Sequence, residues 1–229
     1  MVTGIKCFDV LVVGHPRCGS GFCAYYLNLL GIKTVHEVDW DDVKWTKYQG
    51  LSSWAMTIVH EKNDGIKPSF GQFGSEMRNI TYKNKIVHLR NPFDSFKAIM
   101  DENNVDWSYT IRNKYIIKKL NKNLNNYSGN LEKAIASYLF WYELLINEGY
   151  FFFRIEHDLN KLTNYLKDNV KQELNDLTNE NINTKVNTKK NNNIIKKEDF
   201  SKVNKELMTH LNNFCIKYGY PTFEEYYLK

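Results

Sequence analysis

A short segment near the N-terminus brings together glycines, a hydroxyl and a permanent positive charge. Residues 14–21 read GHPRCGSG. Gly19 and Gly21 let a ligand approach the backbone closely, Ser20 offers a hydroxyl, and Arg17 stays charged at any physiological pH. A turn that leads into a helix N-terminus also points free backbone N–H groups at a bound anion. The segment predicts an anion-binding loop resembling a P-loop, the alternative being a structural glycine-rich turn without a ligand.

The loop departs from a nucleoside triphosphate P-loop at one informative place. Such a loop has Gly-Lys-Ser/Thr where this chain has Gly19-Ser20-Gly21. In a nucleoside triphosphate P-loop, that Lys and the Mg²⁺-binding hydroxyl bind a highly charged triphosphate, and this chain has neither at these positions. Their absence counts against a kinase or a nucleoside triphosphatase.

The elements that must position this loop follow from hydrophobic patterning. Residues 8–14 form a mostly apolar, valine-rich run, as expected of a buried parallel strand, and residues 22–30 predict a helix that ends at Gly31. Further strands are predicted at 55–60, 85–89 and 150–155. Further helices are predicted at 91–100, 109–124, 131–148, from 158 onward and at 199–218, with a polar linker at 179–197. Strands alternating with helices predict a three-layer α/β fold with a central, mostly parallel sheet, like that of P-loop NTPases.

Bulk properties limit the class of protein. The 229 residues suit a single domain spanning 1–229, and the net charge of +5 is too small to indicate nucleic-acid binding. No stretch approaches the length of a membrane span. The four cysteines show no metal-ligand spacing, which predicts free thiols, a cytoplasmic setting and no metal.

The loop also resembles the sulfotransferase family, which carries a Pro-Lys/Arg-x-Gly-Thr/Ser-x-aromatic motif after its first strand. Here the motif reads PRCGSGF at residues 16–22. The resemblance implies that Arg17 stabilises the bridging oxygen between sulfate and phosphate as charge develops there. It implies that the loop holds the 5′-phosphosulfate of 3′-phosphoadenosine 5′-phosphosulfate (PAPS) through Cys18, Gly19, Ser20, Gly21 and Phe22. Phe22 lies either near the adenine or in the core.

A second motif of this family is an Arg-x-Pro at the end of a later strand. It stands here as Arg90-Asn91-Pro92. The resemblance implies that Arg90 binds the 3′-phosphate of the donor, which suits a guanidinium fork. The family's usual Ser eight residues further on is replaced by Ala98. Ser95, one helical turn earlier, is a substitute or a helix cap.

Two later stretches extend the resemblance to about residue 221. Residues 153–159 read FRIEHDL and resemble an Arg-x-Glu-Asp-Leu segment of the family. We interpret Glu156 and Asp158 as structural, capping a helix or pairing with Arg154. The basic loop near the family's C-terminal end folds over the donor, which makes Lys189 and Lys190 candidate phosphate contacts, the alternative being a solvated loop.

Sulfuryl transfer to a hydroxyl benefits from a general base near the acceptor. Two His-Glu pairs stand between the phosphate motifs, His36-Glu37 and His60-Glu61. The sequence does not choose between these pairs, and the base can also lie elsewhere.

The sequence therefore predicts an enzyme that moves a sulfuryl group from PAPS to a hydroxyl or amine of a small-molecule or glycan acceptor, releasing PAP. The alternatives are a P-loop phosphotransferase and a non-catalytic nucleotide-binding relic of the same fold. The sequence leaves the acceptor and the oligomeric state open.

Overall fold

The computed structural model describes residues 6–36, 47–59, 80–146, 150–177, 182 and 195–228. These residues belong to two compact units. Unit 1 comprises residues 1–14, 18–89 and 150–188, and unit 2 comprises residues 15–17, 90–149 and 189–229. The chain thus passes from one unit to the other inside the glycine-bearing loop and again directly after residue 89.

Unit 1 contains a five-stranded sheet in which every pair of neighbouring strands is parallel. The strands are β1 (Lys6–Val13), β2 (Thr34–His36), β3 (Gly50–Ser52), β4 (Ile80–Leu89) and β5 (Phe151–Arg154). Their spatial order is β2-β3-β1-β4-β5. The predicted α/β class with a central parallel sheet is confirmed.

The sheet is buried on both faces, as a parallel sheet must be. On one face, Val10, Val12, Ile86 and Phe153 form a core with two helices, α1 (Ser20–Leu29) and α6 (Leu159–Asn169). Phe22 and Tyr26 of α1 are buried in this core, and so is Leu30 directly after the helix. Alternate strand residues such as Leu11 and Val87, which face the other way, are also fully buried.

The prediction of a strand at residues 55–60 is wrong. Residues Met56–Val59 form a short helix, α2. The strand beside β1 is β3 instead, and it ends where the N–H of Ser53 donates to the carbonyl of Val12 at 3.0 Å. Because residues 50–52 already occupy the position next to β1, the following apolar run turns into a helix.

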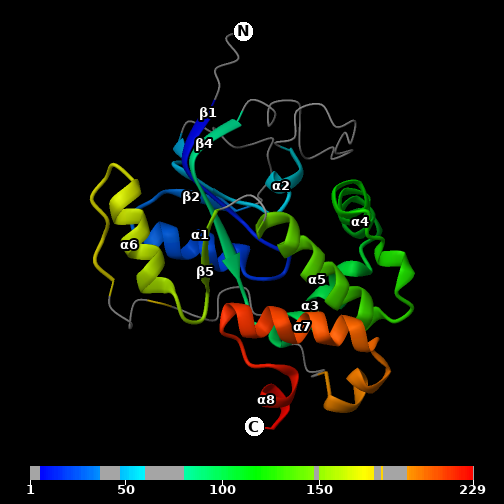
Figure 1. The fold of residues 1–229 in the computed structure, drawn as a ribbon. Helices are drawn as coiled ribbons and strands as arrows, with labels where there is room; N and C mark the ends of the chain where they lie inside the picture. The colour runs from blue at the N-terminus through cyan, green and yellow to red at the C-terminus, as the bar shows by residue number, and fades with distance from the viewer. Residues whose placement is uncertain are drawn as a thin grey trace. The chain divides into compact units, whose positions relative to one another are not determined.

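Unit 2 is helical, and Figure 1 shows α3, α4 and α7 grouped around α5. Its elements are α3 (Pro92–Asn103), α4 (Asp106–Leu120), η3 (Leu124–Asn126), α5 (Asn130–Ile146), η5 (Lys197–Lys202), α7 (Lys205–Tyr218) and α8 (Phe223–Tyr227). The helix ends predicted from the sequence agree best with the structure where a capping residue is present. The side chain of Asn91 accepts the N–H of Phe93 at the start of α3, and Gly219, with φ of 68°, ends α7. No helix among the described residues of either unit is both long and apolar enough to cross a membrane.

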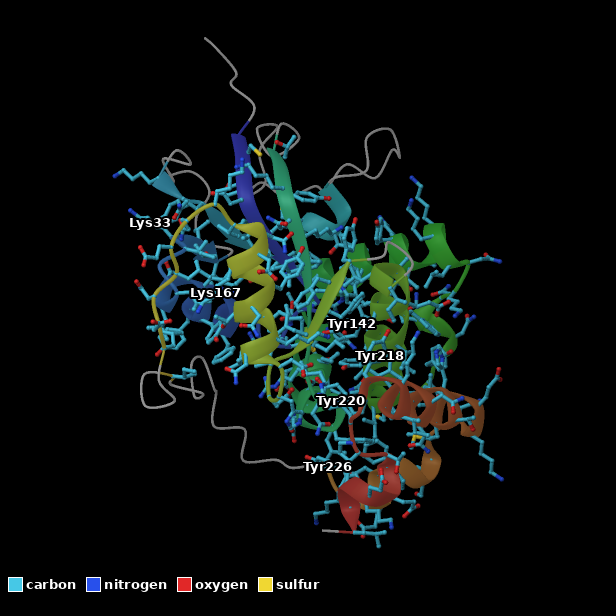
Figure 2. The ribbon with its side chains drawn as sticks, turned by 60° about the vertical axis from the view of Figure 1, so that its left-hand side comes forward. Lys33, Tyr142, Lys167, Tyr218, Tyr220 and Tyr226 are labelled. Carbon is cyan, nitrogen blue, oxygen red and sulfur yellow. The ribbon has the colours of Figure 1, made fainter. Side chains whose placement is uncertain are left out.

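Aromatic side chains make up much of the core of unit 2. Tyr142 of α5 and Tyr218 of α7, both labelled in Figure 2, pack against Phe214 with ring centroids 5.8 and 4.6 Å away. Tyr226 of α8 stacks on Phe93 at 4.8 Å, and its hydroxyl bonds to the Asp94 carboxylate. These contacts tie the C-terminal helix to the first turn of α3.

The strand order of unit 1 creates a topological switch point. The connection that leaves β1 runs toward the β2 edge of the sheet, whereas the connection that leaves β4 runs toward the β5 edge. Ligands of open α/β sheets bind outside the carboxyl ends of two such neighbouring strands. The two segments that follow β1 and β4 are the glycine-bearing loop and the Arg90 motif.

Candidate functional site

The backbone of the glycine-bearing loop alternates in the sign of φ. Arg17 has φ of 69° and Gly19 has φ of 106°, whereas Cys18 between them and Ser20 after them have negative φ. Alternating φ signs are also found in backbone nests, whose successive N–H groups point toward one anion. Among the described residues, only Arg17 and Asn121 combine a side chain with a positive φ. Such strain costs about 1–2 kcal/mol and is found at functional sites.

The helix that follows the loop adds its own N–H groups. Gly19 occupies the N-cap position of α1 and brings no capping side chain. The first helical hydrogen bond runs from Cys23 N–H to the Gly19 carbonyl at 3.0 Å. The N–H groups of the first turn therefore lack a partner within the helix and point toward the loop, where they favour an anion.

In unit 2, His15 ties the first half of the loop to α5. The imidazole is fully buried, and its Nδ1 lies 2.6 Å from the Pro16 carbonyl while its Nε2 lies 2.9 Å from Ser137 Oγ. The His15 backbone N–H donates to the Tyr142 hydroxyl at 3.4 Å. A carbonyl only accepts, so Nδ1 must carry a proton. Arg17, two residues further on, is exposed.

The Arg90 motif is held by Tyr138 of α5, the residue after Ser137. The Tyr138 hydroxyl donates to the Arg90 carbonyl at 2.6 Å, and the Tyr138 ring centroid lies 6.2 Å from that of His15. Within unit 2, His15 and Arg90 are thus anchored on neighbouring residues of α5, Ser137 and Tyr138. Arg90 itself is partly buried.

The Ser95 hydroxyl makes its hydrogen bond as a donor within the first turn of α3. It is fully buried, and the hydroxyl donates to the Asn91 carbonyl at 2.9 Å. Ala98, which replaces the family's Ser, lies on the same helix and is partly buried.

In unit 1, polar side chains at the carboxyl ends of β2 and β3 bond to Ser20. His36 is the last residue of β2, and its Nε2 lies 2.9 Å from the Ser20 hydroxyl. Ser52 ends β3, and its buried hydroxyl donates to the Ser20 carbonyl at 2.8 Å. Burial lowers the pKa of His36, so its imidazole is neutral at neutral pH. Ser20 is therefore held through both its side chain and its backbone.

At two glycines of the loop, an added Cβ would force a neighbouring side chain to shift. A Cβ on Gly14 would lie 2.3 Å from Nε2 of His88, and a Cβ on Gly19 would lie 2.4 Å from Cδ1 of Ile155. Phe22 stacks on Tyr26 at 6.2 Å and belongs to the core of unit 1. Of the two places considered for Phe22, the structure shows the core, and Cys18 is buried as well.

In the late motif after β5, Asp158 pairs with Arg154, which is one of the two structural roles considered for it. The Asp158 carboxylate accepts from the backbone N–H of Arg154 at 2.9 Å and from its guanidinium at 2.8 and 3.0 Å. Glu156 between them is exposed. The pair closes the turn that leads from β5 into α6.

Replacing Asp158 with alanine should lower the free energy of unfolding by about 1–2 kcal/mol, because charge-assisted bonds of this geometry contribute about that much. Hydrogen bonding to Arg154 lowers the pKa of Asp158 below its ordinary value of 3.8. The unfolded chain therefore takes up the proton first, and the pair's stabilisation is lost as the pH falls below that value. Urea denaturation at neutral and acid pH measures both effects.

Asp176→Ala is the matched control for this prediction. Its carboxylate is 98% exposed and lies 3.5 Å from Lys167 Nζ, so its removal should change stability by less than about 0.5 kcal/mol. Equal losses in the two variants would show that the Arg154–Asp158 pair has no special role.

Several predicted site residues lie outside the residues that the structure describes. They are Glu37, His60, Glu61, Lys189 and Lys190. Conversely, sequence reasoning missed Ser52, Ser137 and Tyr138. No local signal marks them, because each acts on the loop or on the Arg90 motif only through the folded chain.

Comparison of the chain with known protein families, with curated proteins and with solved structures gives no match. The functional proposal therefore rests on the residues of the site and on the motif resemblance.

Proposed function

We propose that this protein is a sulfotransferase that moves a sulfuryl group from PAPS to a hydroxyl or amine acceptor. The observation that carries the proposal is the loop at residues 14–22, whose φ signs alternate between Arg17 and Ser20 at the start of a helix. Such a loop binds a phosphate or sulfate group through backbone N–H groups. The loop has neither the Lys nor the Mg²⁺-binding hydroxyl that a triphosphate requires.

The two arginines are assigned different tasks. Arg17 lies in the loop and is exposed, so its guanidinium is available to stabilise negative charge on the bridging oxygen of the donor. Arg90 is proposed to hold the 3′-phosphate through paired N–H bonds. Because Ser95 uses its proton within α3 and Ala98 has none, Arg90 takes this task without a serine. The His15 side chain and the Arg90 carbonyl bond to neighbouring residues of α5 within unit 2, which supports a common ligand for the adjacent Arg17 and Arg90.

PAPS supplies the sulfuryl group together with a good leaving group. A base takes the proton of the acceptor, and the acceptor oxygen or nitrogen forms a bond to sulfur. The bond from sulfur to the bridging oxygen breaks, and its electron pair stays on that oxygen beside Arg17. His36 bonds to Ser20, so we assign the base to Glu37, His60 or Glu61.

The acceptor is proposed to be a small molecule or a glycan. Acceptor sites in α/β folds are built from variable loops, so the fold itself does not name the molecule. Cysteine usage favours a cytoplasmic setting for the reaction.

Calorimetry with PAP tests the proposal. We expect PAP to bind in the presence of EDTA and ATP to bind weakly with or without Mg²⁺. Turnover of radiolabelled PAPS with a panel of phenols, sugars and amines then separates an enzyme from a binding relic. Tight, Mg²⁺-dependent binding of ATP without binding of PAP would overturn the proposal in favour of a phosphotransferase.

Arg90→Ala should weaken PAP binding by about 100-fold, because a charged hydrogen-bonded contact contributes about 1.5–3 kcal/mol. The affinity for AMP, which lacks the 3′-phosphate, should stay within about 2-fold of the wild type. Lys97→Ala, which breaks a surface ion pair with Asp101 on the same helix, should leave both affinities unchanged. Equal losses for PAP and AMP would show that Arg90 does not bind the 3′-phosphate.

A further inference from the structure

In the second half of the loop, the Ser20 hydroxyl makes a hydrogen bond that fixes its direction. Ser20 is buried at 8% exposure, its hydroxyl lies 2.9 Å from Nε2 of His36, and its carbonyl accepts the Ser52 hydroxyl at 2.8 Å. All three residues belong to unit 1 and stand where β2, β3 and α1 begin or end. Because the backbone and the side chain of Ser20 are both fixed, its hydroxyl has a defined direction.

The hydrogen bond between Ser20 and His36 can run in either direction, depending on which ring nitrogen of His36 carries the proton. A serine hydroxyl has one proton and two acceptor positions. If Nε2 of His36 carries no proton, it accepts the hydrogen bond that the only proton of Ser20 can make. A bound anion would then face the lone pairs of the Ser20 oxygen. If Nε2 carries a proton, it donates to the Ser20 oxygen, and the Ser20 proton stays available to the anion. The protonated nitrogen of His36 therefore decides whether Ser20 attracts or repels the ligand.

We propose that His36 is a positioning residue of the phosphosulfate site: its Nε2–H donates to the Ser20 oxygen and directs the Ser20 hydroxyl proton at the bound anion. The inference rests on the proposed function and deepens it. It also gives His36 a role other than the acceptor base. Burial keeps His36 neutral at neutral pH, so the contact depends on the tautomer and not on an added positive charge.

The tautomer can be measured on the protein without ligand. Two-bond ¹H–¹⁵N correlation spectra distinguish the protonated from the unprotonated ring nitrogen, and the His36→Gln variant assigns the signal. We expect His36 to be protonated at Nε2. Protonation at Nδ1 instead would overturn the inference even if PAP binds tightly.

A double-mutant cycle measures the coupling between the two residues. His36→Leu removes the donor and should weaken PAP binding about 10-fold, whereas His36→Gln keeps an N–H donor and should stay within about 3-fold of the wild type. In the Ser20→Ala background, His36→Leu should have no further effect, because the hydroxyl that it orients is gone.

Two outcomes of this cycle count against the inference. If the effects of Ser20→Ala and His36→Leu simply add, His36 does not act through Ser20. If His36→Gln binds PAP as poorly as His36→Leu, the N–H donor is not what matters. Should His36→Leu fail to fold, the glutamine variant and the tautomer still decide. If the wild type binds no PAP although Nε2 carries the proton, the proposed function has failed and the contact is structural.

Discussion

Arg17→Ala should lower the rate of sulfuryl transfer by about 100- to 1,000-fold while PAP affinity falls by about 10-fold at most. The guanidinium is proposed to act on charge that develops at the bridging oxygen only as the bond to sulfur breaks. A group of this kind stabilises the transition state more than the bound donor, so its loss appears mainly in kcat. Arg17→Lys keeps the charge without the planar fork and should recover part of the rate. Radiolabelled PAPS turnover and calorimetry with PAP measure the two quantities.

The backbone at Arg17 supplies an internal control. Its φ of 69° suits glycine better than any residue with a side chain. Arg17→Gly should therefore be about 1 kcal/mol more stable than Arg17→Ala, although both lose the guanidinium and both should be equally inactive. Asn121, with φ of 54° at the end of α4, should show the same ordering of its glycine and alanine variants without any loss of activity. Undiminished turnover in Arg17→Ala would remove Arg17 from the reaction.

The helices and strands that were predicted correctly are those whose secondary structure follows from their own residues. The valine-rich β1, the Asn91–Pro92 start of α3 and the long helix α5 were predicted from their own residues. β2 and β3 have three residues each and become strands only because they pair with one another and with β1. The same pairing explains why the β-branched residues after β3 form a helix, which the pattern at 55–60 did not indicate.

The site shows the same division between local and distant information. The loop and the two arginines were found from contiguous motifs. The groups that hold them come from far along the chain: Ser137 is 122 residues from His15, and Tyr138 is 48 residues from Arg90. Even the Ser20–His36 contact joins residues that were considered separately, one as a phosphate ligand and one as a base. Hydrogen bonds of this kind depend on how elements that are distant in sequence pack together, which a single sequence does not show.

Gly14→Ala should destabilise the protein by about 3 kcal/mol, the upper part of the range for adding a methyl group to a packed interior. The added Cβ would lie 2.3, 2.4 and 2.7 Å from three atoms of the His88 ring, and His88 is fully buried. Gly14 has no positive φ, so the loss would come from the collision and not from backbone strain. Gly129→Ala is the control: its Cβ would meet only Glu132 Cγ at 4.0 Å, and its effect should stay within about 1 kcal/mol. Urea denaturation measures both variants.

The collision can be tested by removing the other partner. In a His88→Ala background the ring is absent, so Gly14→Ala should cost less than about 1 kcal/mol, which gives a coupling of about 2 kcal/mol between the two positions. A cost that is the same in both backgrounds would mean that the glycine is required for another reason. Since Gly14 is the residue where β1 leads into the loop, the collision should displace the loop, and a folded Gly14→Ala protein should bind PAP more weakly. The Gly14→Ala/His88→Ala double variant should bind PAP as His88→Ala does, because the colliding ring is then absent.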